Sequence, residues 1–345
     1  MKAIVWKGPD QVETTEVPKP EVPAGWAMVR VSHAGICGTD KSIYHGFHPR
    51  AKAPLIMGHE YAGVLESDDV PGIKKGARVT VYPLLSCGHC TPCREGNEHV
   101  CNTLGLVGID RDGGFAEYTV CPAESIVEMP DSLSMKLGAF IEPVAVTVHA
   151  LRERNYHPGD NAILFGAGAI GLATACTLKA YGCTDLLLME TNPTRRAKAQ
   201  EMGFETVDPT TVSDMAEFCR SRTGGDGFDW VIDCAGVQPV ANYLFDAVKV
   251  HGTIFIIAGY AKPASLPLGQ GMFKECSIQF TRVYRRKDFA IAVKLVAEHA
   301  DDYEKIITAV YSPDDAKAAF ADAVDPGSRN LKIMFCFENE EGDHV

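Results

Sequence analysis

A glycine motif near the middle of the chain constrains its fold more than any other feature. Gly166-Ala167-Gly168-Ala169-Ile170-Gly171 follows the apolar run Ala162 to Phe165 and opens a helix expected to end near Tyr181. Here the first glycine permits a tight turn, the second lets backbone amides approach a pyrophosphate, and the third lets helix and sheet pack closely. The helix N-terminus adds partial positive charge. The motif predicts a dinucleotide-binding Rossmann fold, and the alternative is a tight turn without a ligand.

Strands and helices alternate from Asp160 onward. Beyond the motif helix come an expected strand at Leu186 to Met189, a helix carrying Arg195 to Met202, and apolar runs at Trp230 to Ile232 and Thr253 to Ala258. This alternation is typical of α/β folds with a doubly wound parallel sheet.

A carboxylate follows the second expected strand and bears on the choice of dinucleotide. Glu190 stands 24 residues after Gly166, where it can accept hydrogen bonds from ribose hydroxyls and would repel a 2′-phosphate, so NAD is favoured over NADP. Arg195 and Arg196 would favour NADP if they lie near the 2′-phosphate. The alternative is that both are solvated residues on a helix face. The predicted cofactor-binding residues are Gly166, Gly168, Ala169, Ile170, Gly171, Glu190 and Arg195.

The residues before about 145 have a different character. They are rich in Val, Gly and Pro, with short alternating runs such as Ala27 to Val31 and Ala77 to Val81, and they predict an irregular β domain. The apolar run Val144 to Leu151 looks helical. After Arg282 we expect a helix from about Phe289 to Ala300 and a terminal strand at Lys332 to Phe337.

Four cysteines within the β-rich region have the spacing of a metal site. Cys87, Cys90, Cys93 and Cys101 form C-x2-C-x2-C-x7-C, which suits four thiolates around structural zinc. A bacterial iron-sulfur run would place its fourth cysteine closer to the third, with a proline behind it. Disulfides or buried free thiols remain an alternative.

A second set of donors precedes this cluster. Cys37 and the pair His59-Glu60 offer a thiolate, an imidazole and a carboxylate, which would leave a fourth zinc position open, as in a catalytic site. Taken singly, His59 is more often a structural histidine and Glu60 a surface carboxylate.

Composition limits the functions to consider. The length of 345 residues suggests two domains, and the formal charge of −12 argues against a general nucleic-acid surface. No apolar stretch approaches the roughly 18 residues of a membrane span, and the start of the chain has no leader pattern. The eight cysteines outside the cluster are scattered, which fits a reducing compartment, so we expect a cytoplasmic protein without membrane or nucleic-acid partners.

Taken together, these segments resemble the zinc-containing medium-chain dehydrogenases, in particular the sorbitol, threonine and polyol dehydrogenase group. The segments that carry the resemblance are Gly35 to Asp40, Gly58 to Glu60, the four-cysteine lobe, Gly113 to Tyr118, Ile141 to Pro143 and the dinucleotide motif. The resemblance implies a GroES-like catalytic domain over residues 1–146, with a zinc lobe over 85–103. It also implies a Rossmann domain over 147–281 and a C-terminal segment, 282–345, that completes the catalytic domain.

The resemblance also implies roles at the catalytic centre. Cys37, His59 and Glu60 would approach a catalytic zinc that acts as a Lewis acid on the substrate hydroxyl, and Glu142 would join them or hold the zinc-bound water. Thr39 would take the hydroxyl proton. Many relatives continue this relay with a histidine where this chain has Ser42. His45 is either its substitute or a surface residue.

Less direct features suggest the substrate and the assembly. The loop between Cys37 and His59 is about three residues shorter than in the sorbitol and threonine enzymes, and its basic groups suit a sugar acid or phosphorylated polyol unless they are only solvated. The expected substrate is a secondary alcohol of a polyol or sugar acid. The alternatives are L-threonine or butanediol, or a non-catalytic sensor of redox state. The resemblance also suggests a homo-dimer or tetramer. The predicted substrate contacts are Tyr44, His45, Arg50, Phe115 and Arg282.

Overall fold

The protein is described by a computed structural model that covers residues 1–68, 70–152 and 156–338. The chain divides into two compact units. One comprises Met1–Ala145 and Tyr284–Val345, and the other comprises Val146–Val283. We call them the discontinuous unit and the continuous unit. Among the described residues, no helix has the length and apolar character needed to cross a bilayer.

The continuous unit is built on one parallel sheet. Its order is β13-β12-β11-β14-β15-β16, and every pairing in it is parallel. Its strands are β11 (Ala162–Phe165), β12 (Leu186–Met189), β13 (Glu205–Val207), β14 (Phe228–Asp233), β15 (Val248–Ile256) and β16 (Ser277–Phe280). The predicted α/β doubly wound architecture is confirmed.

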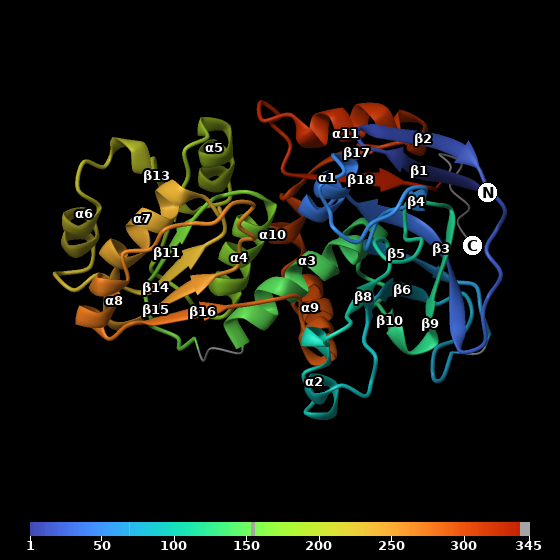
Figure 1. The fold of residues 1–345 in the computed structure, drawn as a ribbon, viewed down its shortest axis with the longest axis horizontal. Coiled ribbons are helices and arrows are strands. Elements are labelled where there is room, and N and C mark those ends of the chain that lie inside the picture. The colour runs from blue at the N-terminus through green and yellow to red at the C-terminus, as the bar shows by residue number, and fades with distance from the viewer. Residues whose placement is uncertain (69, 153–155, 339–345) are drawn as a thin grey trace. The chain divides into compact units, whose positions relative to one another are not determined.

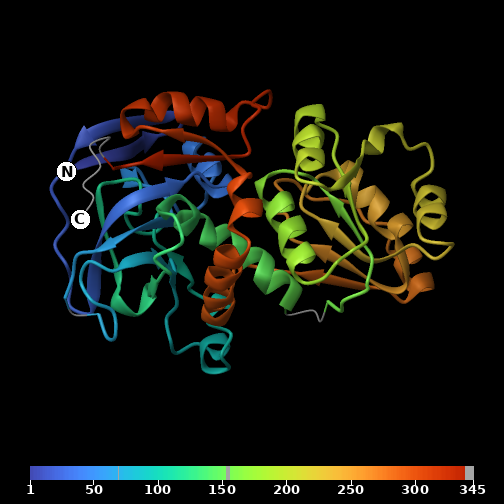
Figure 2. The same ribbon diagram turned by 180° about the vertical axis from the view of Figure 1, so that it is seen from behind.

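Helices cover both faces of this sheet, with α4 and α7 on opposite sides in Figures 1 and 2. The helices of this unit are α4 (Ala169–Ala180), α5 (Pro193–Glu201), α6 (Met215–Arg222), α7 (Gln238–Ala247) and α8 (Leu268–Lys274). Every residue of β11 is buried, because a parallel strand covered on both faces has no solvent side. Ile163, Phe165, Leu187 and Phe245 belong to the resulting core.

Helix α3 (Met135–Arg152) begins nine residues before the apolar run that predicted it. Pro143 lies inside this helix. A proline usually ends or kinks a helix because it lacks an N–H donor, so Glu142-Pro143 resembled a boundary in the sequence. Burial explains the outcome, since Ala139 to Ala145 are all buried and packing outweighs the lost bond.

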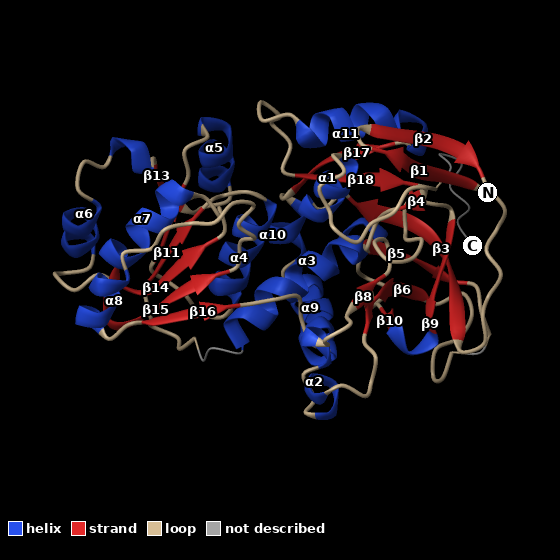
Figure 3. Ribbon diagram, in the orientation of Figure 1, coloured by secondary structure: helices blue, strands red, loops and turns tan. Residues whose placement is uncertain are grey.

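The main sheet of the discontinuous unit joins the two ends of the chain. Its order is β10-β6-β5-β3-β18-β17, with β9 also paired to β3 (Figure 3). Its strands are β3 (Trp26–Gly35), β5 (Glu60–Leu65), β6 (Arg78–Val81), β9 (Tyr118–Pro122), β10 (Ile126–Glu128), β17 (Ile307–Tyr311) and β18 (Lys332–Cys336). The C-terminal strand β18 therefore lies directly beside β3, antiparallel to it.

Smaller elements complete this unit. Helix α11 (Ala316–Val324) packs beside β2, and the ring of Phe320 contacts those of Phe115 and Phe335. The remaining strands are β1 (Lys2–Gly8), β2 (Gln11–Glu16), β4 (Leu55–Ile56), β7 (Leu84–Leu85) and β8 (Gly105–Leu106). The remaining helices are α1 (Gly38–Tyr44), α2 (Thr91–Arg94), α9 (Arg286–Glu298) and α10 (Ala300–Glu304).

Candidate active site and metal centres

The four clustered cysteines converge on one point. The Sγ atoms of Cys90 and Cys93 are 3.4 Å apart, those of Cys90 and Cys101 are 3.8 Å apart, and those of Cys87 and Cys93 are 4.0 Å apart. These separations are too long for disulfides, and all four thiols are free. With Zn–S bonds of about 2.3 Å, a tetrahedral site needs sulfur atoms about 3.8 Å apart. The spacing of the four sulfur atoms therefore fits zinc.

Electrostatics in this lobe also point to a cation. Hydrogen bonds from the backbone N–H groups of His89 and Cys90 lower the pKa of the Cys87 thiol to about 5. Burial and the neighbouring thiols raise the pKa of Cys93 to about 12. Two thiols in one cluster thus differ widely in acidity, because backbone N–H donors favour the thiolate of Cys87 while burial disfavours that of Cys93. A divalent cation would allow all four to be thiolates.

The second donor set is assembled from two neighbouring strand ends. Cys37 lies at the N-cap of α1, just after β3, while His59 and Glu60 lie at the start of β5, which pairs with β3. One ligand atom from each of these three residues lies within 4.8 Å of the other two. His59 and Glu60 are buried and Cys37 is half-buried.

A buried carboxylate lies close to two of these donors. Asp40 accepts a hydrogen bond from the backbone N–H of Cys37 at 2.8 Å. Its other oxygen lies 3.8 Å from Nδ1 of His59, which is too far for a hydrogen bond, and among the described residues neither of these two buried atoms has a hydrogen-bond partner. A carboxylate beside one ring nitrogen directs the other nitrogen toward a metal and raises its basicity.

Glu60 forms a buried ion pair with the C-terminal strand. Lys332 Nζ lies 2.5 Å from Glu60 Oε2 and also donates to the carbonyl oxygen of Ile36 at 3.1 Å. Both side chains are at most 4% exposed. Gly35, which pairs with Glu60 across the strands, leaves room for this carboxylate, because a Cβ at that position would overlap with Glu60 Oε2.

Glu142 lies outside the group of three donors. Its Oε1 accepts a hydrogen bond of 2.6 Å from the hydroxyl of Tyr284, and both residues are buried. Burial, reinforced by the charge of Glu60, raises the pKa of Glu142 to about 7. Without a bound cation, this carboxyl therefore keeps its proton to a higher pH than a free carboxyl does.

The balance of charge tests whether a metal fits here. Asp40, Glu60 and Glu142 are three buried carboxylates that surround His59, and Lys332 supplies one buried ammonium. Burial lowers the pKa of His59, but the charges of Asp40, Cys37 and Glu142 outweigh that effect and raise it well above its ordinary value. A site with this excess of negative charge and with S, N and O donors suits a divalent zinc ion.

The glycine motif of the continuous unit has the expected close contacts. Gly166 has φ +99°, a left-handed conformation that favours glycine. A Cβ on Gly171 would overlap with the carbonyl oxygen of Gly166, so only glycine lets α4 begin so close to β11. Gly168 is the N-cap of α4, and Ala169 and Ile170 are its first two residues.

Glu190 is tied to this turn. Its Oε2 accepts from the backbone N–H of Ala167, and its Oε1 accepts from that of Asn192, both at 2.8 Å. Arg196 donates to the carbonyl oxygens of Glu190 and Thr191 and pairs with Asp208, so its charge is engaged within the fold. Arg195 is half-buried.

Comparison with known proteins agrees with this geometry. The chain matches the sequence profile described as "Alcohol dehydrogenase GroES-like domain" over residues 23–131 and that described as "Zinc-binding dehydrogenase" over residues 169–298. The 2-dehydro-3-deoxy-L-galactonate 5-dehydrogenase of Pseudoalteromonas atlantica is 33% identical over 314 residues, which are 90% of this chain and 91% of that protein. The chain belongs to the zinc-containing medium-chain alcohol dehydrogenase family. The resemblance seen in the sequence is thereby confirmed, and the protein is an oxidoreductase.

Other relatives are named as dehydrogenases of different alcohols. This chain is 33% identical to the D-altritol 5-dehydrogenase of Agrobacterium fabrum, over 87% of this chain and 84% of that protein. It is 32% identical to the (R,R)-butanediol dehydrogenase of Bacillus subtilis, over 91% and 93%.

Solved structures of relatives contain nicotinamide dinucleotides. A zinc-binding dehydrogenase of Sinorhizobium meliloti bound to NADP aligns with a TM-score of 0.90 and 30% identity, over 97% of this chain and 98% of that one. An alcohol dehydrogenase of Escherichia coli (rspB) in complex with NADH aligns with a TM-score of 0.89 and 28% identity, over 98% and 99%.

The residues predicted for the proton relay lie on or near α1 of the enzyme. Thr39 and Ser42 lie on this helix and are half-buried. His45 follows the helix, and its Nδ1 lies 2.6 Å from Oδ1 of Asp10 in an exposed pair. This exposed contact with Asp10 agrees with the interpretation of His45 as a surface residue. Tyr44 stacks on the ring of Phe320 at 5.1 Å.

The other predicted substrate contacts are dispersed. Arg50 donates to the carbonyl oxygen of Leu104 and lies 3.3 Å from Asp110, in the region of the cysteine lobe. Phe115 is fully buried against other core rings, and this burial speaks against a substrate contact. Arg282 is exposed at the end of the continuous unit.

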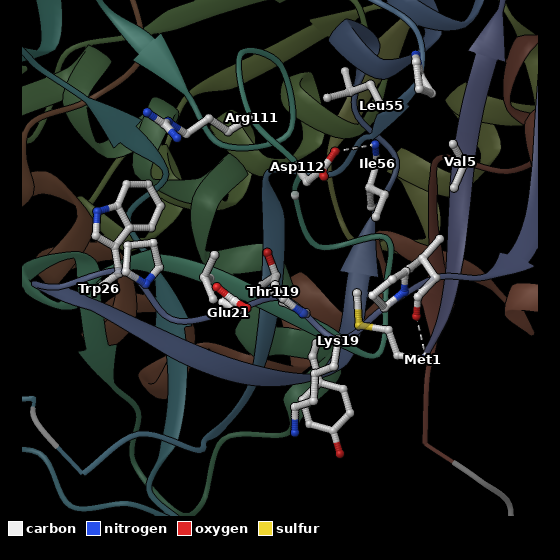
Figure 4. A pocket seen from close by; sticks show the side chains of 18 of the residues that line it. Met1, Val5, Lys19, Glu21, Trp26, Leu55, Ile56, Arg111, Asp112 and Thr119 are labelled. Atoms are coloured by element: carbon white, nitrogen blue, oxygen red, sulfur yellow. Dashed lines mark hydrogen bonds between the residues drawn. The ribbon is translucent and has the colours of Figure 1, made fainter.

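A cavity of about 700 Å³ opens elsewhere in the discontinuous unit (Figure 4). Trp26, Leu55, Ile56 and Arg111 are among its lining residues. No predicted metal ligand or substrate contact lines it, so this cavity is distinct from the candidate active site.

Reasoning from the sequence missed three residues of this site. Asp40 belongs to the motif around Cys37 but was given no role, although a carboxylate three residues after the N-cap of a helix is a capping signal. Tyr284 and Lys332 had no local signal, because their partners Glu142 and Glu60 are 142 and 272 residues away in the chain.

Proposed function

We propose that this enzyme interconverts a secondary alcohol of a polyol or sugar acid and the corresponding ketone, with NAD as the hydride carrier. The observation that carries the proposal is the donor set of half-buried Cys37 and buried His59 and Glu60 in a member of this family. Two relatives at 33% identity are named as 5-dehydrogenases of a sugar acid and of a polyol, which supports this substrate class.

In the proposed mechanism Cys37, His59 and Glu60 hold the zinc ion. When bound, zinc supplies Lewis acidity toward the substrate oxygen, and NAD accepts the hydride. Asp40 keeps the His59 ring in its ligating orientation, and Lys332 fixes the position of the Glu60 carboxylate.

Proton transfer is the second part of the mechanism. We propose that Thr39, two residues from Cys37, accepts the substrate hydroxyl proton and passes it outward. Glu142, whose charge acts on His59, serves as a further acid or base of the site, and Tyr284 holds one of its oxygens. Thr39→Ala should lower turnover far more than zinc content. Near-normal turnover in that variant would remove Thr39 from the relay.

NAD is proposed over NADP because of Glu190. A buried carboxylate at the end of β12 disfavours the additional phosphate of NADP. Arg196 is engaged with Asp208 and with backbone carbonyl oxygens, which leaves Arg195 as the nearby cation for this phosphate. The ratio of kcat/KM for NAD to that for NADP tests the assignment, and a preference for NADP would refute it.

One experiment tests the proposed function as a whole. NADH production is measured with a panel of polyols, sugar acids, L-threonine and 2,3-butanediol, before and after chelation of zinc and after its return. We expect oxidation of a polyol or sugar acid that chelation abolishes and zinc restores. Activity that persists after zinc has been removed, as measured by metal analysis, would refute the mechanism.

Butanediol is the second candidate substrate, because a relative at 32% identity carries that name. L-Threonine is tested in the same panel. Selective oxidation of 2,3-butanediol in preference to every sugar derivative would show that butanediol is the substrate.

We also propose that the enzyme forms homo-oligomers in the cytoplasm. Strand β16 is an edge of its sheet, and exposed apolar side chains gather on it and on α8: Leu268, Met272, Phe273 and Phe280. Such an edge favours pairing with a second copy. All twelve cysteines are free, which suits a reducing compartment. A Phe280→Lys variant should shift the mass measured by light scattering toward the monomer, and a wild-type monomer would refute oligomerisation.

A further inference from the structure

A third group of metal donors lies at the opposite end of the strand pair that leads to the catalytic donors. Strand β18 runs antiparallel to β3, with Met334 opposite Gly35 and Cys336 opposite His33. One ligand atom from each of His33, Cys336 and Glu338 lies within 4.8 Å of the other two. These three residues belong to neither donor set described above.

The backbone holds the two softer donors rigidly. Opposed residues on antiparallel strands keep their Cβ atoms about 5 Å apart, a separation that one metal ion can bridge. The ladder continues beyond Cys336, because the N–H of Phe337 donates to the carbonyl oxygen of Ser32 at 2.8 Å. His33 and Cys336 are therefore placed by the backbone pairing of β3 with β18 and do not depend on a loose loop.

The histidine ring has support from a neighbour. Nδ1 of His33 lies 2.8 Å from the hydroxyl oxygen of Ser32, which is 2% exposed. A hydrogen bond of this kind fixes the tautomer and orientation of a ligating imidazole. Burial lowers the pKa of His33, which favours the neutral ring that a metal ligand requires.

We propose that His33, Cys336 and Glu338 form a third metal site, which takes zinc or a similar soft divalent cation. Imidazole, thiolate and carboxylate are the donors that zinc prefers, and three protein ligands leave a fourth position for water. Binding releases the proton of the Cys336 thiol. The ion ties the C-terminal strand to β3. The proposal does not depend on the dehydrogenase activity.

Zinc stoichiometry tests the proposal. The purified enzyme is equilibrated with excess zinc, freed of unbound metal by gel filtration, and analysed for zinc per chain. We expect Cys336→Ser to hold one zinc ion fewer than the wild type. Cys276→Ser is the matched control, because Cys276 is also a half-buried free thiol but lies outside every donor group among the described residues. It should retain the wild-type zinc content.

Two further measurements keep the test decisive if Cys336→Ser folds poorly. Cadmium added to the zinc-loaded wild type should produce a thiolate-to-metal ultraviolet band that His33→Gln weakens. Glu338→Gln changes an exposed side chain and should weaken binding of this ion by at least about tenfold, while the other bound zinc ions remain. Equal zinc content in the wild type and Cys336→Ser, or unchanged binding in Glu338→Gln, would overturn the three-donor site.

Discussion

Lys332 supplies positive charge to a buried group of carboxylates. Its ion pair with Glu60 is almost completely excluded from water, so removal of the ammonium leaves an uncompensated buried charge beside the metal donors. Loss of one partner of a buried pair costs roughly 3–5 kcal/mol, whereas a surface pair is worth about 0–1 kcal/mol.

Lys332→Met should therefore lower the free energy of unfolding by roughly 3–5 kcal/mol, as measured by chemical denaturation. The matched control is Lys2→Met. Lys2 lies 2.9 Å from Asp314, and both side chains of that pair are at least 36% exposed. Its loss should cost less than about 1 kcal/mol. Equal losses of unfolding free energy in Lys332→Met and Lys2→Met would contradict the conclusion that a buried ion pair costs more to break than an exposed one.

Glu142 should make the stability of the metal-free protein depend on pH. Its folded pKa of about 7 lies above the ordinary value of 4.5. Between these two pH values the unfolded carboxyl loses its proton while the folded one keeps it, so the folded state loses stability as pH rises. The total loss is roughly 3 kcal/mol.

Glu142→Gln should abolish this part of the pH dependence. Chemical denaturation of the chelated wild type and variant, at pH values from 4.5 to 8, measures the difference between them. The variant should gain relative stability as pH rises. A difference that is constant with pH would exclude a raised pKa at Glu142.

The residues of the site differ in how far the sequence reveals them. Cys37, His59 and Glu60 have a recognisable local pattern, and the structure brings one ligand atom from each together. Their supporting partners, Tyr284 and Lys332, are recruited across long stretches of chain, and no local pattern encodes such a contact.

Whole elements were predictable where turn residues and periodicity agree. The observed limits of β11 and β12 match the apolar runs that predicted them, because both strands are buried on two faces and bounded by turns. Helix α3 shows the opposite case, since Pro143 obscured a helix that tertiary packing maintains. Strand β16 and helix α8 were not predicted, because their short segments lack clear periodicity.

The cysteine lobe is expected to depend on a bound metal ion for its fold. Cys93→Ser should lower the zinc content by one ion per chain and lower the unfolding temperature, because the lobe has little apolar core and none of α2 is buried. Cys37→Ser should instead abolish turnover with a smaller effect on unfolding. Metal analysis, calorimetry and NADH production measure these outcomes. A fully stable but inactive Cys93→Ser variant would show that the two metal roles are assigned to the wrong sites.

At the scale of the whole molecule, the metal donors and the dinucleotide motif belong to different compact units. The donor groups identified in the structure all lie in the discontinuous unit, and the glycine motif and Glu190 lie in the continuous one. Each unit builds its site from its own sheet.

Chelation should therefore leave dinucleotide binding largely intact. The dissociation constant of NADH, measured by fluorescence titration before and after zinc removal, should change by less than about tenfold, or 1.4 kcal/mol. Turnover should disappear in the same sample. Loss of NADH binding together with zinc would contradict separate construction of the two sites.

The position of β18 also determines the order in which a newly made chain becomes active. Residues leave the ribosome from the N-terminus, so the whole of Val146–Val283 is available to fold before Lys332 has been synthesised. Until then β3 lacks β18, one of the three strands that pair with it, and Glu60 lacks its counter-ion. Competence for chemistry is thus the last property that each translated copy acquires, and a ribosome that stalls early releases a nucleotide-binding fragment without a complete catalytic centre.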